Sequence, residues 1–228
     1  MLKFMPFLLI VLYGLAMWHF SAWRLRAELN ARSRPLSDPA LDPVRRRLAR
    51  ALDVPEVPVH LYDVDPVNGL AAPDGRIFIT RGFYRKFRDG EVSAEELASV
   101  IAHELGHVAL GHSRRRMIDF SGQNALRLML ATLLGRLLPG LGAWIAGFLT
   151  TLLAARLSRR DEYEADAYAS ALLVKAGIGT GPQKSLFAKL ERLTGAGAAA
   201  PAWLMTHPPT AERIRAIEAN EARWGLGR

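Results

Sequence analysis

The first strong pattern of hydrophobic positions is an apolar run near the N-terminus. Phe4 to Trp23, FMPFLLIVLYGLAMWHFSAW, holds 20 residues without a formal charge, and a helix of that length crosses the hydrocarbon core of a bilayer. A cleaved signal peptide is the alternative, but the run is long for one and no small-x-small cleavage site follows it. The pattern therefore predicts an uncleaved transmembrane anchor at 1–24.

The basic residues that flank this run bear on its orientation. Lys3 and the amino terminus precede it, whereas four arginines follow it: Arg24, Arg26, Arg32 and Arg34. Because positive charge beside a span favours the cytoplasmic side, the pattern slightly favours a cytoplasmic over a periplasmic C-terminal domain. We expect the anchor to lie in a bacterial inner membrane.

A proline-rich stretch and then a mixed pattern follow the anchor. Residues 25–43 have the composition of a linker, with three prolines in the last eleven positions. Residues 44–52, VRRRLARAL, have helical periodicity, and 57–64 and 75–80 have the composition of strands. The chain from 44 to 228 is predicted to form one domain.

From Ser93 onward the periodicity is that of helices. Ser93 and Glu96 have the spacing of a capping box and predict a helix start there. Further amphipathic helices are expected at 161–176, 182–193 and 208–224. These patterns predict an α+β fold that is predominantly helical, with a small β-sheet.

A second apolar region interrupts the helical part of the chain at 125–156. Its core, Leu137 to Ala155, holds 19 residues without a charge and predicts two apolar helices hinged at Pro139-Gly140. The segment is either a buried helical hairpin or one that lies against the membrane or partly enters it. We slightly favour the membrane, because a domain of this size has little other mass with which to bury so much apolar surface.

Composition narrows the classes of partner. The chain of 228 residues is 50% hydrophobic and carries a formal net charge of +8, a balance that suits nucleic acid or an anionic membrane surface. No RNA-binding signature or zinc-finger spacing is present in the sequence, so we expect a lipid bilayer as a partner and no nucleic acid. Cysteine is absent, so any metal site must use histidine and carboxylate ligands.

The strongest chemical motif is H-E-x-x-H, inside the predicted helix. His103 and His107 lie four residues apart and share one helical face, from which both imidazoles can reach one cation. Glu104 projects beside them, where it can accept a proton from the attacking water. A catalytic zinc needs a third protein ligand. His112 is a poor choice, because it lies about 180° round the helix from His103, and we expect it at the helix end or the surface.

A better third ligand lies after the apolar region. Glu162 and Asp166 are spaced i, i+4 and share a face, so Glu162 can bind zinc while Asp166 accepts a hydrogen bond from a ligand histidine. Asp161 is a weaker alternative ligand. Glu164 points about 200° away from Glu162 and is expected in solvent or paired with an arginine.

Four motifs, in this order, resemble the zinc membrane metallopeptidases that include the HtpX-type heat-shock proteases and the CAAX prenyl endopeptidases. They are VNGLAAPDGRIFITRG (67–82), SVIAHELGHVALGH (99–112), SRRDEYEADAYASALL (158–173) and MTHPPTAERIRAI (205–217). The resemblance implies a zincin-like (gluzincin) domain and endopeptidase activity with Glu104 as general base. It also implies one zinc ion per chain, held by His103, His107 and Glu162, with Asp166 hydrogen-bonded to a ligand.

The resemblance assigns further residues that spacing alone does not. His207 and Arg213, in HPPTAER, match a late His and Arg pair near the active site, where they would stabilise the oxyanion of the tetrahedral intermediate. A short stretch resembles the sheet edge that binds an extended substrate: Asn68, Gly69, Leu70 and Ala71. The family has NAFA or similar where this chain has NGLA, so the subsite is expected to be looser or reshaped.

These features predict a membrane-anchored zinc endopeptidase that acts on membrane-associated or misfolded polypeptides in membrane or envelope protein quality control. The alternative is a metal-binding membrane chaperone or scaffold with little hydrolytic activity, and the intact Glu104 argues against it. Prenyl-peptide processing is disfavoured, because the chain lacks the many spans needed for a large intramembrane chamber.

Overall fold

The computed structural model of the chain describes residues 5–72, 74–112, 126–132, 134–139, 141–193 and 209–226. The chain forms two compact units. One consists of Met1–Glu28 and Gly111–Ser158, and the other of Leu29–Leu110 and Arg159–Arg228. The second unit contains the sheet and the candidate site.

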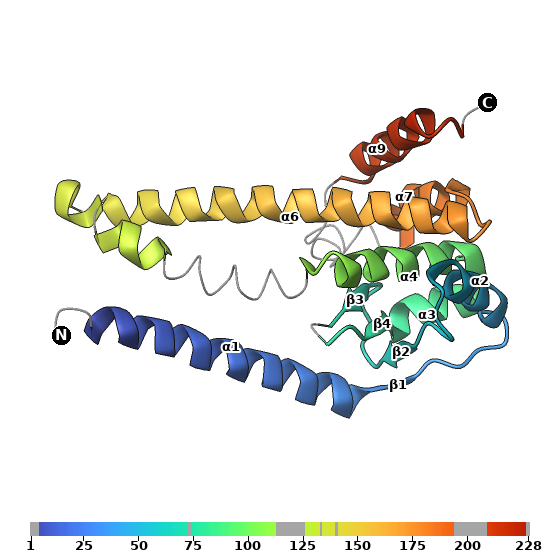
Figure 1. The fold of residues 1–228 in the computed structure, drawn as a ribbon, viewed down its shortest axis with the longest axis horizontal. Helices are drawn as coiled ribbons and strands as arrows, with labels where there is room; N and C mark the ends of the chain where they lie inside the picture. The colour runs from blue at the N-terminus through green and yellow to red at the C-terminus, as the bar shows by residue number, and fades with distance from the viewer. Residues whose placement is uncertain are drawn as a thin grey trace. The chain divides into compact units, whose positions relative to one another are not determined.

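The second unit is built on a small mixed sheet (Figure 1). Among the described residues its four strands are β1 Ser33–Pro35, β2 Val59–Tyr62, β3 Gly69–Ala71 and β4 Ile77–Thr80, in the spatial order β1-β2-β4-β3. β2 and β4 are parallel, and the two outer pairs are antiparallel. The strands predicted at 57–64 and 75–80 are confirmed as β2 and β4, whereas β1 falls within the stretch expected to be a linker.

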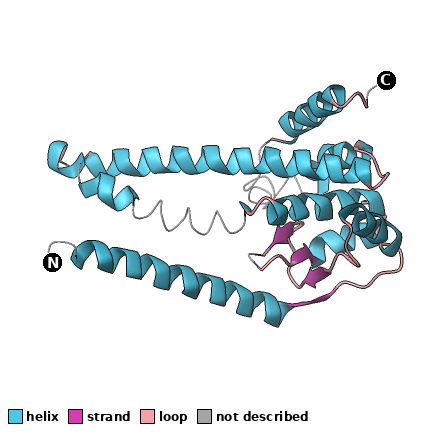
Figure 2. Ribbon diagram, viewed as in Figure 1, coloured by secondary structure: helices cyan, strands magenta, loops and turns pink. Residues whose placement is uncertain are grey.

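Helices make up most of the described chain (Figure 2). They are α1 Met5–Arg32, α2 Asp42–Leu52, α3 Arg81–Arg88, α4 Ala94–Ala109, α6 Gly142–Lys175, α7 Gly181–Leu193 and α9 Thr210–Arg223. The predicted fold, predominantly helical with a small sheet, is confirmed. The sequence did not indicate α3, because its 8 residues are too few to show a helical period.

The start of α4 is fixed by the predicted capping box. The Ser93 hydroxyl accepts a hydrogen bond from the Glu96 backbone N–H at 3.1 Å, and the Glu96 carboxylate accepts one from the Ser93 N–H at 2.9 Å. Two N–H groups that no helical carbonyl can reach are thereby satisfied. The helix then runs without a break through both histidines of the H-E-x-x-H motif.

α6 is one continuous helix of 34 residues. The sequence suggested two helices instead, an apolar one ending near Ala155 and an amphipathic one beginning at Asp161. No glycine or proline occurs between Phe148 and Ala176, so nothing in the backbone interrupts the helix where its polarity changes. The part of the apolar region from Gly142 onward and Glu162 therefore lie on the same helix.

The sheet of the second unit has two different faces. Val59, Leu61, Ile77 and Ile79 belong to the main core cluster together with side chains of α2 and α4. On the other face, Phe78 packs with Leu29 and Ala72, so the last turn of α1 is attached to the sheet. Side chains of successive strand residues point to opposite faces, which explains why β4 is buried throughout.

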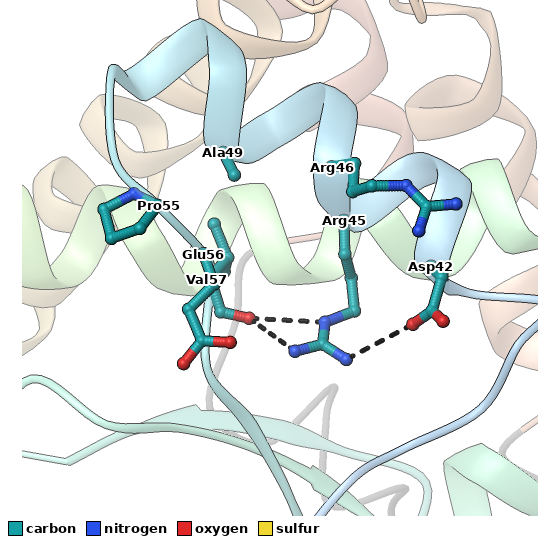
Figure 3. Close-up of a pocket in the computed structure, with 7 residues that line it drawn as sticks. All are labelled: Asp42, Arg45, Arg46, Ala49, Pro55, Glu56 and Val57. Atoms are coloured by element: carbon teal, nitrogen blue, oxygen red, sulfur yellow. Dashed lines mark hydrogen bonds and ion pairs between the residues drawn. The ribbon is translucent and has the colours of Figure 1, made fainter.

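Arg45 connects α2 to the segment that precedes β2 (Figure 3). Its Nε and Nη2 donate to the Val57 carbonyl at 3.3 and 3.0 Å, and its Nη1 lies 3.7 Å from the Asp42 carboxylate. Nη1 also donates to the Leu36 carbonyl at 3.2 Å. Its guanidinium thus satisfies backbone carbonyls of two loops, which is a structural role.

The first unit contains the apolar segment. Residues 126–132 and 134–137 are helical, Leu138 and Pro139 are not, and α6 begins at Gly142, so the helix breaks at the proline of the predicted hinge. Large apolar side chains are exposed here, among them Leu137 (76%), Trp144 (68%) and Phe148 (52%).

The predicted anchor overlaps α1, which is helical from Met5 onward. Within the described part of the chain, no helix combines the length and the apolarity needed to cross a bilayer. The transmembrane anchor therefore stays a prediction.

Candidate metal centre

The two histidines of α4 present their Nε2 atoms to the same point. His103 and His107 are 2% and 4% exposed, and their rings lie nearly perpendicular at a centroid distance of 4.7 Å. The two Nε2 atoms are 3.1 Å apart. One helical turn thus brings both imidazoles to one site, as their spacing predicts.

Glu162 of α6 completes a group of three candidate ligands. It is fully buried, with Oε2 3.3 Å from Nε2 of His103 and Oε1 3.4 Å from Nε2 of His107. Ligand atoms about 2.1 Å from a tetrahedral zinc ion lie about 3.4 Å from one another, so these separations fit the ion. Three protein ligands leave one position for a reactant, the arrangement of catalytic rather than structural zinc.

Asp166 contacts the ring nitrogen of His103 that does not face Glu162. Its Oδ1 lies 2.9 Å from Nδ1 of His103, a contact that directs the other ring nitrogen toward Glu162 and His107. Burial lowers the pKa of His103, but hydrogen bonds to Asp166 and Glu162 outweigh burial and raise it to about 9. The negative charge that favours a proton on this ring also favours a metal cation beside it.

Arg213 of α9 holds Asp166 in place. Its Nε and Nη2 donate to the two carboxylate oxygens at 2.7 and 2.6 Å, and its guanidinium carbon lies 4.1 Å from the centre of the Phe187 ring. Burial raises the pKa of Asp166, but Arg213 lowers it to about 2. The carboxylate therefore stays ionised although it is inaccessible to water.

This position differs from the one expected for Arg213. The sequence assigned it to the oxyanion, but the structure places the fully buried guanidinium on Asp166, 3.4 Å from Nδ1 of His103. Nδ1 is the ring nitrogen that does not face Glu162. Arg213 therefore contacts Asp166, which in turn contacts His103. His207, which was predicted to act with Arg213, lies outside the described residues, so its role stays a prediction.

Glu104 directly follows His103 on α4 and is 3% exposed. It is close to β3, because a Cβ added to Gly69 would come within 3.2 Å of its Oε1 and 2.7 Å of the Val100 side chain. The four residues expected to bind substrate, Asn68 and the three of β3, thus run along the outer strand of the sheet, next to the candidate general base.

The remaining acidic and histidine candidates are not members of this group. Asp161, the weaker alternative, is not among the three residues whose ligand atoms converge with those of His103. Glu164 pairs with Arg160 at 2.7 Å, which confirms the expected arginine partner. His112 follows α4 and is buried rather than exposed.

Comparison with known proteins decides the family. The sequence model of the family described as "Peptidase family M48" matches residues 35–221. The chain belongs to peptidase family M48. The resemblance to HtpX-type zinc metallopeptidases is thereby confirmed, and the buried group of two histidines and a glutamate is where this M48 chain could hold its zinc ion.

Three relatives show the range of similarity. The metalloprotease LoiP of Escherichia coli is 33% identical over 167 residues, which cover 73% of this M48 chain and 63% of LoiP. The mitochondrial metalloendopeptidase OMA1 of Danio rerio is 29% identical over 70% of this chain and 34% of its own length. The protease HtpX of Pseudomonas paraeruginosa is 25% identical over 74% and 67%, respectively. The chain thus matches between about a third and two thirds of these relatives.

Gly106 is a site residue of this M48 chain that the sequence analysis missed. It lies between the two histidines, and a Cβ there would meet backbone atoms of Ala165 at 3.0 and 3.1 Å and the Tyr168 side chain at 3.3 Å. The absence of a side chain lets α4 and α6 approach closely enough for Glu162 to reach the histidines. A glycine in mid-helix, which costs about 1 kcal/mol relative to alanine, was the signal.

Gly106→Ala is therefore expected to weaken zinc binding about tenfold and to destabilise the fold by about 1–3 kcal/mol, the usual cost of overpacking. Backbone atoms of α6 must shift to make room, and Glu162 moves with them. Zinc competition with a chromogenic chelator and urea denaturation measure the two effects. Gly181→Ala is the matched control, because no atom lies within 4 Å of its added Cβ; equal zinc affinities in the two variants would contradict the assignment.

Arg213→Ala is expected to destabilise the protein by about 3–5 kcal/mol, because it leaves the Asp166 carboxylate buried without its cation. Arg213→Lys should restore only part of this loss, since an ammonium cannot donate to both oxygens from one plane. Urea denaturation measures both. Arg215→Ala, on the same helix at an exposed position, is the control; a similar small loss in all three variants would exclude the positioning role.

Proposed function

We propose that this chain is a zinc-dependent endopeptidase that hydrolyses peptide bonds of membrane-associated or misfolded polypeptides. One observation carries the proposal. In a buried site, the Nε2 atoms of His103 and His107 lie 3.1 Å apart and 3.3 and 3.4 Å, respectively, from the two carboxylate oxygens of Glu162. The buried Glu104 directly follows His103 on α4. The names metalloprotease and metalloendopeptidase among the relatives support the same class of reaction.

The residues have distinct roles in this proposal. A zinc ion held by the three ligands would supply a Lewis acid that polarises the scissile carbonyl and acidifies water. Glu104 accepts the proton of the attacking water and passes it to the leaving amine. Asp166 and Arg213 keep the His103 ring in the orientation that presents Nε2. His207 is proposed to stabilise the oxyanion.

The substrate is proposed to bind along β3 in an extended conformation. β3 is an outer strand of the sheet, with β4 on one side, and an extended peptide can add to such an edge through main-chain hydrogen bonds. Because Gly69 lies against Glu104, a peptide on this edge would bring its backbone close to the general base. The other three residues of the stretch, Asn68, Leu70 and Ala71, would form the rest of the contact.

Gly69→Ala tests this placement. The added methyl group must displace Val100 or Glu104, so we expect kcat/KM for casein cleavage to fall about tenfold, which corresponds to about 1.4 kcal/mol. Zinc content should not change, because the three atoms nearest the new Cβ belong to Val100 and Glu104 and not to the three candidate ligands. A loss of zinc together with activity, or unchanged cleavage, would contradict a role beside the base. Gly181→Ala again serves as the control.

The location is proposed to be a membrane, with the run from Phe4 to Trp23 as anchor and the catalytic domain on the cytoplasmic side. The uncharged run and the arginines after it support this orientation. Exposed apolar side chains between Leu137 and Leu152 support contact of the apolar segment with lipid. A role in membrane protein quality control follows from that location and stays part of the proposal.

Metal removal is the decisive test of the proposed reaction. The detergent-solubilised full chain should contain one zinc ion and cleave casein; a chelator should abolish cleavage, and added zinc should restore it. A chain that binds zinc yet leaves casein and denatured membrane proteins intact would instead be the metal-binding scaffold. Failure to bind zinc at all would refute both functions.

A further inference from the structure

A groove rich in arginine lies in the second unit, on the side of the sheet formed by β1. It has a volume of about 580 Å³ and is lined by residues of β1, β2, α3 and the end of α1. Its arginines are Arg32, Arg34, Arg81, Arg85 and Arg88, whereas Asp63 is its one carboxylate among the described lining residues. None of these side chains belongs to the candidate metal centre.

Three of the arginines come from one face of α3. Arg81, Arg85 and Arg88 are spaced i, i+4 and i+7, which places them on one stripe of the helix. Asp65 accepts hydrogen bonds from Arg81 and Arg85 at 3.0 and 3.1 Å and is itself 69% exposed. One carboxylate therefore aligns two guanidinium groups.

Arg88 is held by a buried carboxylate. Asp38 is 3% exposed and accepts a hydrogen bond from the Tyr84 hydroxyl at 2.6 Å and one from Arg88 at 3.0 Å. The hydrogen bond from Tyr84 and the charge of Arg88 outweigh burial and lower the pKa of Asp38. Arg88 stays 60% exposed, so its remaining N–H groups can bind a ligand without the cost of ordering the side chain.

Among the arginines of the groove, the positive charge of Arg34 is the one least neutralised by carboxylates. It is exposed on β1, and its guanidinium makes no ion pair or hydrogen bond to another residue in the described part of the chain. Arg81 meets Asp63 at 2.6 Å, so Asp38, Asp63 and Asp65 together face five arginines. The groove thus holds more guanidinium groups than carboxylates. Hydrogen bonds to Asp65 and Asp38 fix the orientation of several of these guanidinium groups.

We propose that this groove binds the phosphate of anionic phospholipid headgroups. A planar guanidinium group can donate two parallel hydrogen bonds to two oxygens of one phosphate. Arg is therefore favoured over Lys at sites that bind phosphate in this way. The lining begins at Ala31 and Arg32, at the end of the helix that contains the proposed anchor. The proposal that the phosphate belongs to a lipid therefore depends on the proposed membrane anchor. The proposal that the groove binds phosphate does not depend on the peptidase activity.

Nucleic acid is the less suitable ligand for the same charges. Single-stranded nucleic acid is bound by arginines interleaved with aromatic rings on which bases stack. The aromatic residue in the described lining is Tyr84, and its hydroxyl is fixed to Asp38. The groove thus offers charge without a stacking platform.

Native mass spectrometry of the full chain in neutral detergent tests the proposal. Short-chain phosphatidylglycerol should remain bound to the wild type, and short-chain phosphatidylcholine should not. Arg34→Ala with Arg85→Ala should reduce the bound fraction about tenfold, as expected for the loss of two charge-assisted contacts. Arg46→Ala with Arg50→Ala removes the same charge from the exposed side of α2 and should retain the lipid.

Each other outcome overturns the proposal. If both double variants lost the same fraction of bound lipid, the lipid would respond to the net charge of the protein and not to the groove. If the groove variant bound as much lipid as the wild type, the lipid would bind elsewhere. Inorganic phosphate that competes as well as the lipid would make this a free-phosphate site, and preferential binding of a DNA oligonucleotide would make it a nucleic-acid site. Casein cleavage by the groove variant should equal that of the wild type, and carbonate extraction tests the membrane anchor separately. A failure of the lipid site can therefore be distinguished from a failure of the proposed function.

Discussion

Glu104→Gln is expected to reduce casein cleavage by about 10²- to 10⁴-fold, the usual contribution of a general base. The amide has the shape of the carboxylate but cannot take the proton of the attacking water. Zinc content should stay at that of the wild type, because Glu104 is not one of the three residues whose ligand atoms converge. Zinc analysis and casein cleavage on one preparation measure both quantities.

The control for this variant is Glu95→Gln, at the start of the same helix. Glu95 lies two turns before His103, so its loss should change neither zinc content nor cleavage. If the Glu104 variant cleaved casein as fast as the control, the assignment of the general base would be wrong. If it lost zinc, Glu104 would be a ligand rather than a base.

Glu162→Gln is expected to lower zinc affinity by more than about 100-fold, since even residues that only support a ligand are worth 10- to 100-fold. Cleavage should fall in proportion to the zinc that is lost, and a large excess of zinc should restore part of it. The distinction from Glu104→Gln is sharp, because that variant stays inactive at any zinc concentration. Zinc titration with an activity readout checks both.

Glu164→Gln is the matched control on the same helix. Its carboxylate pairs with Arg160 and is 34% exposed, and pairs of that kind are worth at most about 1 kcal/mol. We expect normal zinc binding and cleavage. Stoichiometric zinc in Glu162→Gln would exclude Glu162 as a ligand and make Asp161 the next residue to test.

The parts of the site that could be predicted are those encoded by spacing along one helix. The four-residue separation of His103 and His107 and the capping box at Ser93 involve neighbours within two turns, so the sequence alone determines their geometry. Glu162 and Asp166 were identified in the same way, although their distance from α4 depends on how two helices pack.

The parts that could not be predicted depend on contacts between distant segments. Arg213 was expected at the oxyanion, but nothing in HPPTAER shows that Asp166 lies within 2.7 Å of it. Gly106 matters because of Ala165, and β1 forms only because β2 is beside it. For α6 the cause is local: the polarity of the sequence changes near Asp161, which suggests a break, but no glycine or proline interrupts the helix there.

The ion pair of Arg213 and Asp166 has a consequence for biosynthesis. The two residues are 47 positions apart, and Arg213 follows His103 by 110 positions. Before α9 is synthesised, Arg213 is not available to pair with Asp166, so burial of the Asp166 carboxylate against His103 would be costly. A growing chain therefore contains both histidines well before the buried contacts around His103 can be completed.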